Sequence, residues 1–376
     1  MAMTSGAMAR HSTDAHAAIE RIDVSAFTIP TDAPESDGTY EWTSTTLVVV
    51  ETHAGGESGL GYTYADAATA GLIHDQLADV VAGLDAFAVP LAWQRMVQSI
   101  RNLGRPGVAS MAIAAVDVAL WDLKAMLLGL PLVSLLGAAR DSAPVYGSGG
   151  FTSYSLDRLQ EQLGGWAGQG IRHVKMKIGR DAAADRQRVA AAREAIGSEV
   201  ELFVDANGAY SRKQALAQAE SFAEQEVCWF EEPVSSDDLA GLRVLRDRAP
   251  PGMEIAAGEY GYDLPYFRRM LEAGAVDVLQ IDATRAAGIS GFLQAAAVAA
   301  AFGLEVSAHC APALHAHPCC AIANVRPLEY FHDHARIEQM LFDGAPKPVA
   351  GALRPDLSRP GMGLEFKRAD AERYAI

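Results

Sequence analysis

Basic residues and long apolar runs are both scarce in this chain. Its 376 residues include 31 Lys and Arg against 47 Asp and Glu, a net charge of −16. This surplus of negative charge argues against nucleic acid or an anionic membrane as a partner, although a metal ion or a lysine pair can still reverse the field inside a site for an anionic substrate. The longest apolar run, around residues 114–136, is interrupted by Asp117, Asp122, Lys124 and Pro131. We therefore expect a buried helix there rather than a membrane span.

Cysteine is also rare, and no disulfide framework is visible. The four cysteines are Cys228, Cys310, Cys319 and Cys320. A reducing cytoplasm is therefore the expected location. Residues 1–18 lack the apolar core of a secretory signal and are interpreted as a loose leader. A complete phosphate-binding loop is missing too, because residues 147–150 (Gly-Ser-Gly-Gly) do not have the spacing of one.

Residues 19–138 predict an α+β domain. The expected antiparallel strands, rich in β-forming residues, are Ile22–Ile29, Thr45–Glu51 and Gly59–Tyr64. Between the first two, Pro30–Tyr40 is rich in Pro, Asp and Ser, and we expect a long hairpin loop that contacts ligand. Helices are expected over residues 66–136, the clearest being Ser110–Leu128, which a Gly and a Pro terminate.

From residue 139 onward, strand-like apolar runs alternate with helix-like segments, and each run ends in a polar or ionisable residue. These residues are Ser148, Lys177, Asp205, Glu231, Glu259, Asp282, His309 and Glu329. The last seven lie 20 to 28 residues apart, the length of one strand plus one helix and two short loops. Eight such units predict an α/β fold, a (β/α)8-type TIM barrel over residues 139–342. The α+β domain is expected to cap it, with residues 343–376 packing back on the cap.

Three consecutive strand ends carry acids that predict a metal site. Active residues of such barrels lie at the carboxyl ends of the strands, and neighbouring strands are ~4.8 Å apart. Asp205, Glu231 and Glu259 can therefore converge on one ion. An all-oxygen ligand set favours Mg²⁺, with Mn²⁺ possible, and argues against Zn²⁺.

Candidate bases flank this predicted metal site. Lys175 and Lys177 point to the same face of their strand, and the repulsion between like charges predicts a lowered lysine pKa suited to a general base. His309 ends the seventh strand beside Asp282, which would fix its tautomer and raise its basicity. Glu329 is expected at the substrate carboxylate. Bases on two flanks of a divalent ion suit removal of a proton next to a carboxylate.

From about Arg21 to its C-terminus the chain resembles the enolase superfamily, specifically the mandelate racemase subgroup. The motifs that carry the resemblance are Lys175-Met176-Lys177, Asp205-Ala206-Asn207, Glu231-Glu232-Pro233, Gly258-Glu259, Asp282 with Ala287-Gly288, Ser307-Ala308-His309, Leu328-Glu329 and Trp121-Asp122-Leu123-Lys124. Two departures are visible. Asp282 stands where the related muconate-cycloisomerising branch carries Lys, which argues against that branch, and Ala287 replaces the first Gly of a Gly-Gly pair.

The resemblance implies an α+β cap over the barrel, a homo-oligomer (dimer or octamer), and a role for most of the strand-end residues. Asp205, Glu231 and Glu259 would bind Mg²⁺, and Lys177 with the His309–Asp282 dyad would be the acid/base catalysts. Substrate or electrophilic contacts would come from Lys175, Asn207 and Glu329, and we add Ser148 and Tyr62 as expected substrate contacts. The loops Pro30–Trp42 and Gly59–Tyr64 would select the substrate.

Within this subgroup the expected reaction is dehydration of a sugar acid, an aldonate or aldarate, to a 2-keto-3-deoxy acid. The runner-up is a racemase or epimerase of a 2-hydroxy acid, which needs the same residues. The segment Pro30–Trp42 carries Thr31, Asp32, Glu35, Ser36 and Asp37, which favours a polyhydroxy substrate.

Two further functions remain as alternatives. A zinc-dependent hydrolase is suggested by the histidines and cysteines at positions 309–320, although the first strand has no histidine at its end and Cys319 and Cys320 are expected to pack inside a helix. A non-catalytic metal-binding homologue would be expected to have lost a carboxylate or a base, and none is missing.

Overall fold

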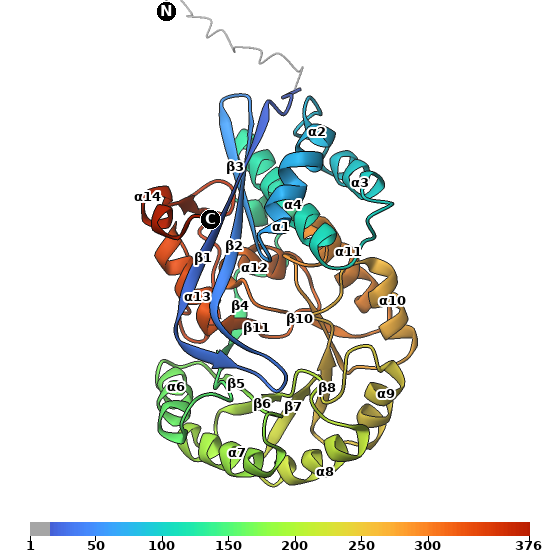
Figure 1. Ribbon diagram of the computed structural model, residues 1–376, viewed down its shortest axis with the longest axis vertical. Helices are drawn as coiled ribbons and strands as arrows, with labels where there is room; N and C mark the ends of the chain where they lie inside the picture. Colours follow the sequence, from blue (N-terminus) through green and yellow to red (C-terminus); the bar gives the residue numbers. More distant parts are fainter. Residues whose placement is uncertain (1–15) are drawn as a thin grey trace, which may run out of the picture.

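The computed structural model describes residues 16–376 (Figure 1). Residues 1–15 of the predicted leader (residues 1–18) lie outside the described part. Ala18 pairs with Asp85 of the cap. An N-terminal α+β cap covers a curled parallel sheet. The cap elements are β1 (Arg21–Ser36), β2 (Glu41–Ala54), β3 (Glu57–Tyr64), α1 (Ala68–Leu72), the π-helical turn η1 (Ile73–Leu77), α2 (Ala78–Val81), α3 (Val89–Ser99), α4 (Val108–Leu128) and α5 (Leu132–Leu136).

The cap sheet is antiparallel in the order β1-β2-β3, and its first hairpin differs from the prediction. The segment predicted as a long loop, Pro30–Tyr40, is mostly strand: β1 runs on to Ser36, with a register shift between Pro30 and Glu35. An edge strand tolerates both a proline and an irregularity of this kind. The turn is short because Asp37 Oδ1 accepts hydrogen bonds from the backbone N–H groups of Thr39 (2.6 Å) and Tyr40 (2.7 Å).

Helix α4, predicted as Ser110–Leu128, packs directly on β3. It is apolar all round, as suits a helix buried between the cap sheet and the barrel, and it ends at Gly129 with φ 63°. Two glycines of β3 permit the close approach: a Cβ at Gly61 would lie 2.1 Å from the Ala115 carbonyl oxygen. Among residues 16–376 no helix, α4 included, is long and apolar enough to cross a membrane.

Replacing Gly61 by alanine is therefore expected to destabilise the fold by at least about 1–3 kcal/mol, the usual cost of overpacking. The atoms that its methyl group meets are the Ala115 carbonyl oxygen and the backbone nitrogen and Cβ of Ala119, none of which can rotate away. The change is measured as a lower midpoint in denaturant unfolding. Gly71→Ala is the matched control, since a Cβ there meets nothing within 4 Å and an alanine suits a helix. Equal midpoints for the two variants would contradict the proposed close packing.

The remaining chain confirms the predicted alternation of eight parallel βα units. These elements are β4 (Ala143–Gly149), α6 (Leu156–Gly168), β5 (His173–Lys177), α7 (Ala182–Ile196), β6 (Glu201–Asp205), α8 (Arg212–Ala223), β7 (Val227–Glu231), α9 (Leu239–Arg248), β8 (Glu254–Ala257), α10 (Leu264–Glu272), β9 (Val278–Ile281), α11 (Gly288–Ala301), β10 (Glu305–Ala308), α12 (Pro312–Ala321), β11 (Leu328–Phe331) and α13 (His332–Leu341). In Figure 1 helices α6 to α10 form an outer arc around the strands, while the cap hairpin reaches across the strand ends.

The sheet is a curled half-barrel rather than a closed ladder. Its strand order is β10-β9-β8-β7-β6-β5-β4-β11, so the two strands at its ends are β10 and β11. An isolated bridge between Val306 and Val325 joins β10 to the segment before β11. At the next position the Ser307 hydroxyl, instead of a backbone N–H, donates to the Pro327 carbonyl (2.7 Å). Stacked rings of Phe203 and Trp229, with centroids 4.9 Å apart, fill the interior at the middle of strands β6 and β7.

The C-terminal segment lies against both parts of the molecule. Its elements are β12 (Phe342–Asp343), β13 (Ala352–Leu353), β14 (Glu365–Phe366), α14 (Arg368–Ala371) and the 3-10 turn η2 (Glu372–Tyr374). Strand β13 pairs with β4, and Ala375 pairs with Phe27 of the cap. The buried carboxylate of Asp122, on α4, accepts hydrogen bonds from the N–H groups of Leu60 in β3 (2.7 Å) and Met362 in the tail (2.6 Å).

Candidate active site

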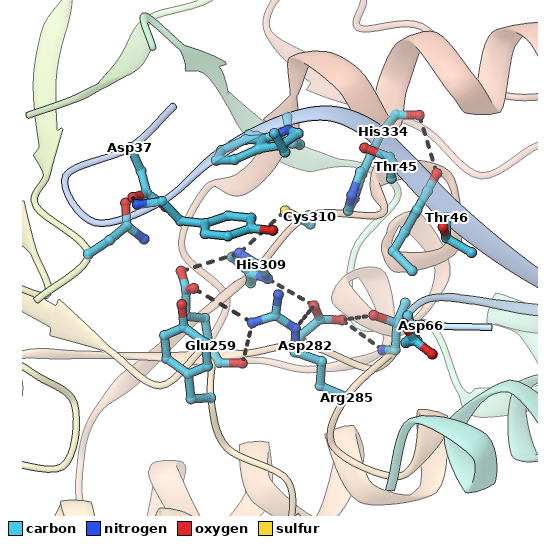
Figure 2. A pocket seen from close by; sticks show the side chains of 18 of the residues that line it. Asp37, Thr45, Thr46, Asp66, Glu259, Asp282, Arg285, His309, Cys310 and His334 are labelled. Carbon is cyan, nitrogen blue, oxygen red and sulfur yellow. Dashed lines mark hydrogen bonds and ion pairs between the residues drawn. The ribbon is translucent and has the colours of Figure 1, made fainter. Parts of the chain in front are cut away.

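A cavity of about 480 Å³ lies at the carboxyl ends of the strands, beneath the β1–β2 hairpin (Figure 2). This is the size range of small-molecule sites. The residues that line it are Asp37, Thr39, Tyr40, Trp42, Ser44, Thr45, Thr46, Tyr64, Ala65, Asp66, Lys177, Asn207, Glu259, Tyr260, Asp282, Thr284, Arg285, His309, Cys310, Phe331 and His334. The cap supplies the first half of this list and the strand ends supply the second.

The three acids predicted to bind metal lie together, and one of them, Glu259, lines this cavity. One carboxylate oxygen from each of Asp205, Glu231 and Glu259 lies within 4.8 Å of the others, and all three side chains are buried. Glu259 follows β8 directly after Gly258, where a Cβ would lie 2.1 Å from the Gln280 carbonyl oxygen, so only glycine fits. Burial and the neighbouring charge of Asp205 raise the pKa of Glu231 well above its usual value.

Both lysines of β5 are buried and paired with these acids. Lys177 Nζ donates to Asp205 Oδ2 (2.5 Å), and Lys175 Nζ donates to Glu231 Oε1 (2.5 Å) and Glu329 Oε1 (2.8 Å). Burial opposes their positive charge, but the carboxylates outweigh it and hold the pKa of both lysines above the usual value. The predicted lowering of the lysine pKa is therefore wrong. The repulsion by Lys175 does act on Lys177 in the predicted direction, but it is the weaker influence.

Across the cavity, His309 lies between two carboxylates. Its Nδ1 contacts Asp282 Oδ2 at 2.8 Å, as predicted for the dyad, and its Nε2 lies 3.3 Å from Glu259 Oε2. The other oxygen of Asp282 accepts two hydrogen bonds from Thr284, through its N–H and its hydroxyl (both 2.7 Å). Burial opposes the ionised form, yet the hydrogen bond with His309 and its charge hold the pKa of Asp282 below its usual value. Figure 2 shows His309 between Glu259 and Asp282.

The expected substrate contacts divide into two groups. Asn207 lines the cavity, and its Oδ1 is buried without a hydrogen-bond partner among residues 16–376. Lys175, Ser148 and Glu329 form a buried layer behind the acids: the Ser148 hydroxyl donates to Glu329 Oε1 at 2.6 Å, and all three are essentially inaccessible. Lys175, Ser148 and Glu329 therefore contact other residues of the site and do not line the cavity.

Tyr62 does not line the cavity, contrary to its expected role as a substrate contact. It is fully buried between β3 and α13, and its hydroxyl donates to Glu338 Oε1 (2.7 Å) while accepting from the N–H of Leu314 (3.1 Å). Tyr64, two residues on, does line the cavity and stacks on His334 with ring centroids 3.4 Å apart.

The buried carboxyl of Glu338 gives a testable pH dependence. Burial raises its pKa from 4.5 to about 8. Between pH 4.5 and about pH 8 the carboxyl of Glu338 is protonated in the folded chain but ionised in the unfolded chain. Its contribution to the free energy of unfolding is therefore complete below about pH 4.5 and is lost as the pH rises through about 8. We expect Glu338→Gln to flatten the decline of unfolding free energy over this window, by up to about 1.4 kcal/mol per pH unit. Denaturant unfolding at several pH values measures it. An unchanged slope, as expected for the exposed control Glu57→Gln, would contradict the raised pKa.

The sequence analysis missed several residues that surround the predicted ones. Arg285 N–H donates to the Glu259 carbonyl (3.1 Å), and its guanidinium lies 3.6 Å from the Glu259 carboxylate and 3.7 Å from that of Asp282. Trp42 donates through Nε1 to the buried Glu35 (2.9 Å). The available signal for Arg285 was an arginine three residues after the strand-end Asp282. No comparable signal marks Trp42, because its position depends on the hairpin.

The histidines and cysteines of α12 do not form the zinc site of the hydrolase alternative. His315 Nε2 accepts the N–H of Ala283 (2.9 Å), and its other nitrogen contacts backbone carbonyls. His317 is likewise held between the backbone of Val133 and that of Met362. Cys319 and Cys320 are buried in the helix, as predicted.

A cap over parallel βα units, with acids, lysines and an Asp–His pair at the strand ends, defines the enolase type of capped barrel. Two family models match the chain: "Mandelate racemase / muconate lactonizing enzyme, N-terminal domain" over residues 8–137 and "Enolase C-terminal domain-like" over residues 158–371. The chain therefore belongs to the mandelate racemase / muconate lactonizing enzyme family of the enolase superfamily, and the predicted resemblance is confirmed.

Three relatives illustrate the similarity. A mandelate racemase/muconate lactonizing enzyme-like protein from Rubrobacter xylanophilus is 57% identical, with a TM-score of 0.94 over 96% of this chain and 100% of that one. The 3,6-anhydro-alpha-L-galactonate cycloisomerase of Streptomyces coelicolor is 32% identical over 93% of this chain and 98% of its own. The L-talarate/galactarate dehydratase of Salmonella typhimurium is 32% identical over 86% of this chain and 83% of its own. A structure of that dehydratase, liganded with Mg and L-lyxarohydroxamate, has a TM-score of 0.88 at 28% identity over 100% of this chain and 97% of that one.

Proposed function

We propose that this chain removes the proton next to the carboxylate of a sugar acid with the help of Mg²⁺, and so dehydrates an aldonate or aldarate to a 2-keto-3-deoxy acid. One observation carries the proposal. A buried triad of oxygen ligands reaches the cavity through Glu259, and the same cavity is lined by Lys177 and by the His309–Asp282 pair.

The residues present fit a hard divalent cation. The triad Asp205, Glu231 and Glu259 offers only oxygen ligands, which suit Mg²⁺ or Mn²⁺. Glu259 Oε2 is buried and has no hydrogen-bond partner among residues 16–376, and the pKa of Glu231 is raised by burial and by its acidic neighbour. Buried acids crowded in this way are stabilised by a cation. When bound, the ion would stabilise the negative charge that develops on the substrate carboxylate.

Lys177 and His309 divide the proton transfers between them. One of these two groups takes the proton from C2 of the substrate while the electron pair moves toward the carboxylate. The imidazolium of His309 gives a proton to the departing 3-hydroxyl, which leaves as water. Tautomerisation of the resulting enol gives the 2-keto-3-deoxy acid. Asp282 holds Nδ1 of His309, so that Nε2 faces the cavity.

The walls of the cavity support a polyhydroxy substrate. The β1–β2 hairpin and the following loop contribute mainly hydroxyl and carboxylate side chains, namely Asp37, Thr39, Ser44, Thr45, Thr46 and Asp66. Such groups hydrogen-bond sugar hydroxyls. In this proposal the cap (residues 19–138) selects the substrate and the barrel (residues 139–342) performs the chemistry, with residues 343–376 closing the cap. A cytoplasmic homo-oligomer is part of the same proposal.

Racemisation or epimerisation of a 2-hydroxy acid is the second candidate. The same two groups, on opposite sides of the α-carbon, would exchange its proton without loss of a hydroxyl. The ammonium form of Lys177, favoured by Asp205, is the proton donor that this reaction needs. The cycloisomerase of Streptomyces coelicolor shows that a relative at 32% identity carries out another reaction.

A panel of aldonates and aldarates, incubated with the Mg²⁺-loaded protein, tests the proposal. We expect a 2-keto-3-deoxy product from at least one acid, detected by its carbonyl reagent adduct and by mass loss of one water. Parallel incubations in D2O follow the α-proton by NMR. Exchange without water loss would replace dehydration by the racemase candidate. If no acid of the panel shows either α-proton exchange or a dehydrated product, both candidate reactions are contradicted.

A further inference from the structure

Cys310, which follows His309, belongs to a second group of possible metal ligands. Its Sγ lies 3.3 Å from His309 Nε2 and 3.4 Å from Glu329 Oε2, and that nitrogen and oxygen are 3.7 Å apart. All three side chains are buried, yet His309 and Cys310 line the cavity (Figure 2). The proposed reaction does not use the thiol.

These separations match the ligand cage of a tetrahedral thiophilic ion. With Zn–S of about 2.3 Å and Zn–N or Zn–O of about 2.0–2.2 Å, tetrahedral ligands lie roughly 3.4–3.6 Å apart. The observed spread of 3.3 to 3.7 Å is close to this range. A sulfur, a nitrogen and an oxygen together favour Zn²⁺ or Co²⁺ over Mg²⁺.

The surrounding contacts orient these three ligands. His309 Nδ1 is held by Asp282 at 2.8 Å, the carboxylate–histidine arrangement that supports metal-bound histidines. Glu329 Oε2 accepts the N–H of Cys310 (2.9 Å), while Lys175 and Ser148 occupy its other oxygen. Each ligand is therefore already fixed without an ion.

Glu259 supplies an independent indication. The residue is only 3% exposed, and its buried Oε2 lies 3.3 Å from His309 Nε2 and lacks a hydrogen-bond partner within the described chain. Glu259 itself belongs to the oxygen triad and not to the group of His309, Cys310 and Glu329, so the fourth ligand of the tetrahedron would be water.

We propose that His309, Cys310 and Glu329 form a second metal site that binds Zn²⁺ or a similar thiophilic ion and thereby blocks turnover. On binding, the thiol releases its proton to solvent, sulfur and imidazole each donate an electron pair to the ion, and no oxidation occurs. Nε2 of His309 is then no longer available for proton transfer. Inhibition rests on the proposed function, whereas binding does not.

Cobalt provides a direct test on the Mg²⁺-saturated protein. Co²⁺ is expected to produce the strong near-ultraviolet absorption of a thiolate–cobalt bond, and Zn²⁺ is expected to abolish it by displacement. Cys310→Ser should lose this absorption and weaken Zn²⁺ binding by about tenfold or more, since even indirect supports of a metal site are worth that much. Cys320→Ser and Cys228→Ser are matched controls that retain both. Absorption that survives in Cys310→Ser, or that never appears, overturns the site.

Anomalous diffraction from wild-type crystals grown with Mg²⁺ and Zn²⁺ needs no variant. A zinc peak within bonding distance of His309 Nε2 and Cys310 Sγ is expected, and zinc found only at the Asp205–Glu231–Glu259 triad overturns the proposal. With a substrate in hand, Zn²⁺ added over saturating Mg²⁺ should inhibit wild type and Cys320→Ser alike. A protein that shows the cobalt absorption but turns over no sugar acid would keep the second metal site and refute the proposed function alone.

Discussion

Replacing His309 by asparagine is expected to lower kcat by about 10²–10⁴-fold, the usual contribution of a positioned acid or base. Asparagine is close in size and can still accept or donate a hydrogen bond near Asp282, but it cannot carry a proton at the position of Nε2. Turnover of the sugar acid found in the panel measures the loss. Lys177→Ala is expected to have an effect of the same order, because the proposed reaction needs both groups for its proton transfers.

The two variants also separate the two candidate reactions. His309→Asn keeps Lys177, so α-proton exchange in D2O can continue on one face while product formation stops. His53→Asn, on β2 beside Asp23, is the matched control and should leave kcat unchanged. Turnover near the wild-type rate in both His309→Asn and Lys177→Ala, with the fold intact by circular dichroism, would refute the assignment of two bases.

Converting Glu231 to glutamine is expected to lower the Mg²⁺-dependent kcat by about 10³-fold, because a divalent ion supplies several kcal/mol of charge stabilisation. The amide removes one of three negative charges from the triad and sets an NH₂ group against either Lys175 or Trp229, which now donate to the two Glu231 oxygens. Calorimetric titration with Mg²⁺ and kinetic assays measure the two losses together. A chelator should stop the wild-type protein in the same way, with Mg²⁺ restoring activity better than Zn²⁺.

Glu201→Gln is the control for this change, since Glu201 is exposed at the opposite end of a neighbouring strand. Wild-type Mg²⁺ affinity in Glu231→Gln would show that the triad is not the metal site. Preferential activation of the wild type by Zn²⁺ would favour the hydrolase alternative instead.

The strand ends could be predicted from the sequence because parallel βα units repeat at nearly constant length. A strand that ends in Asp205 and another that ends in Glu231 must bring those residues to the same edge of the sheet, so spacing alone places them. Paired register positions confirm this, since Asp205 is the partner of both Lys177 and Glu231. The Asp282–His309 contact was predictable for the same reason.

What could not be predicted depends on neighbours that are distant in sequence. The lysine pKa was mispredicted because the two lysines were considered as a pair, whereas in the folded chain carboxylates from three other strands surround them. Tyr62 and Tyr64 share one face of β3, so the alternation of side chains does not distinguish them; only Tyr64, the last residue of the strand, reaches the cavity, whereas Tyr62 packs against Glu338 and Leu314. The sequence predicts a loop at Pro30–Tyr40 because proline and acidic residues disfavour strands, and only the position of β1 at the sheet edge admits them.

The carboxylate of Asp122, which joins β3 to the tail, has a consequence for how the protein is made. The cap is synthesised first, yet it is completed by Met362 and by Ala375, whose strand-like contact with Phe27 adds a last pairing. During synthesis the cap therefore lacks these two contacts until residues 362–375 have left the ribosome, which happens only after all eight strands of the barrel have emerged.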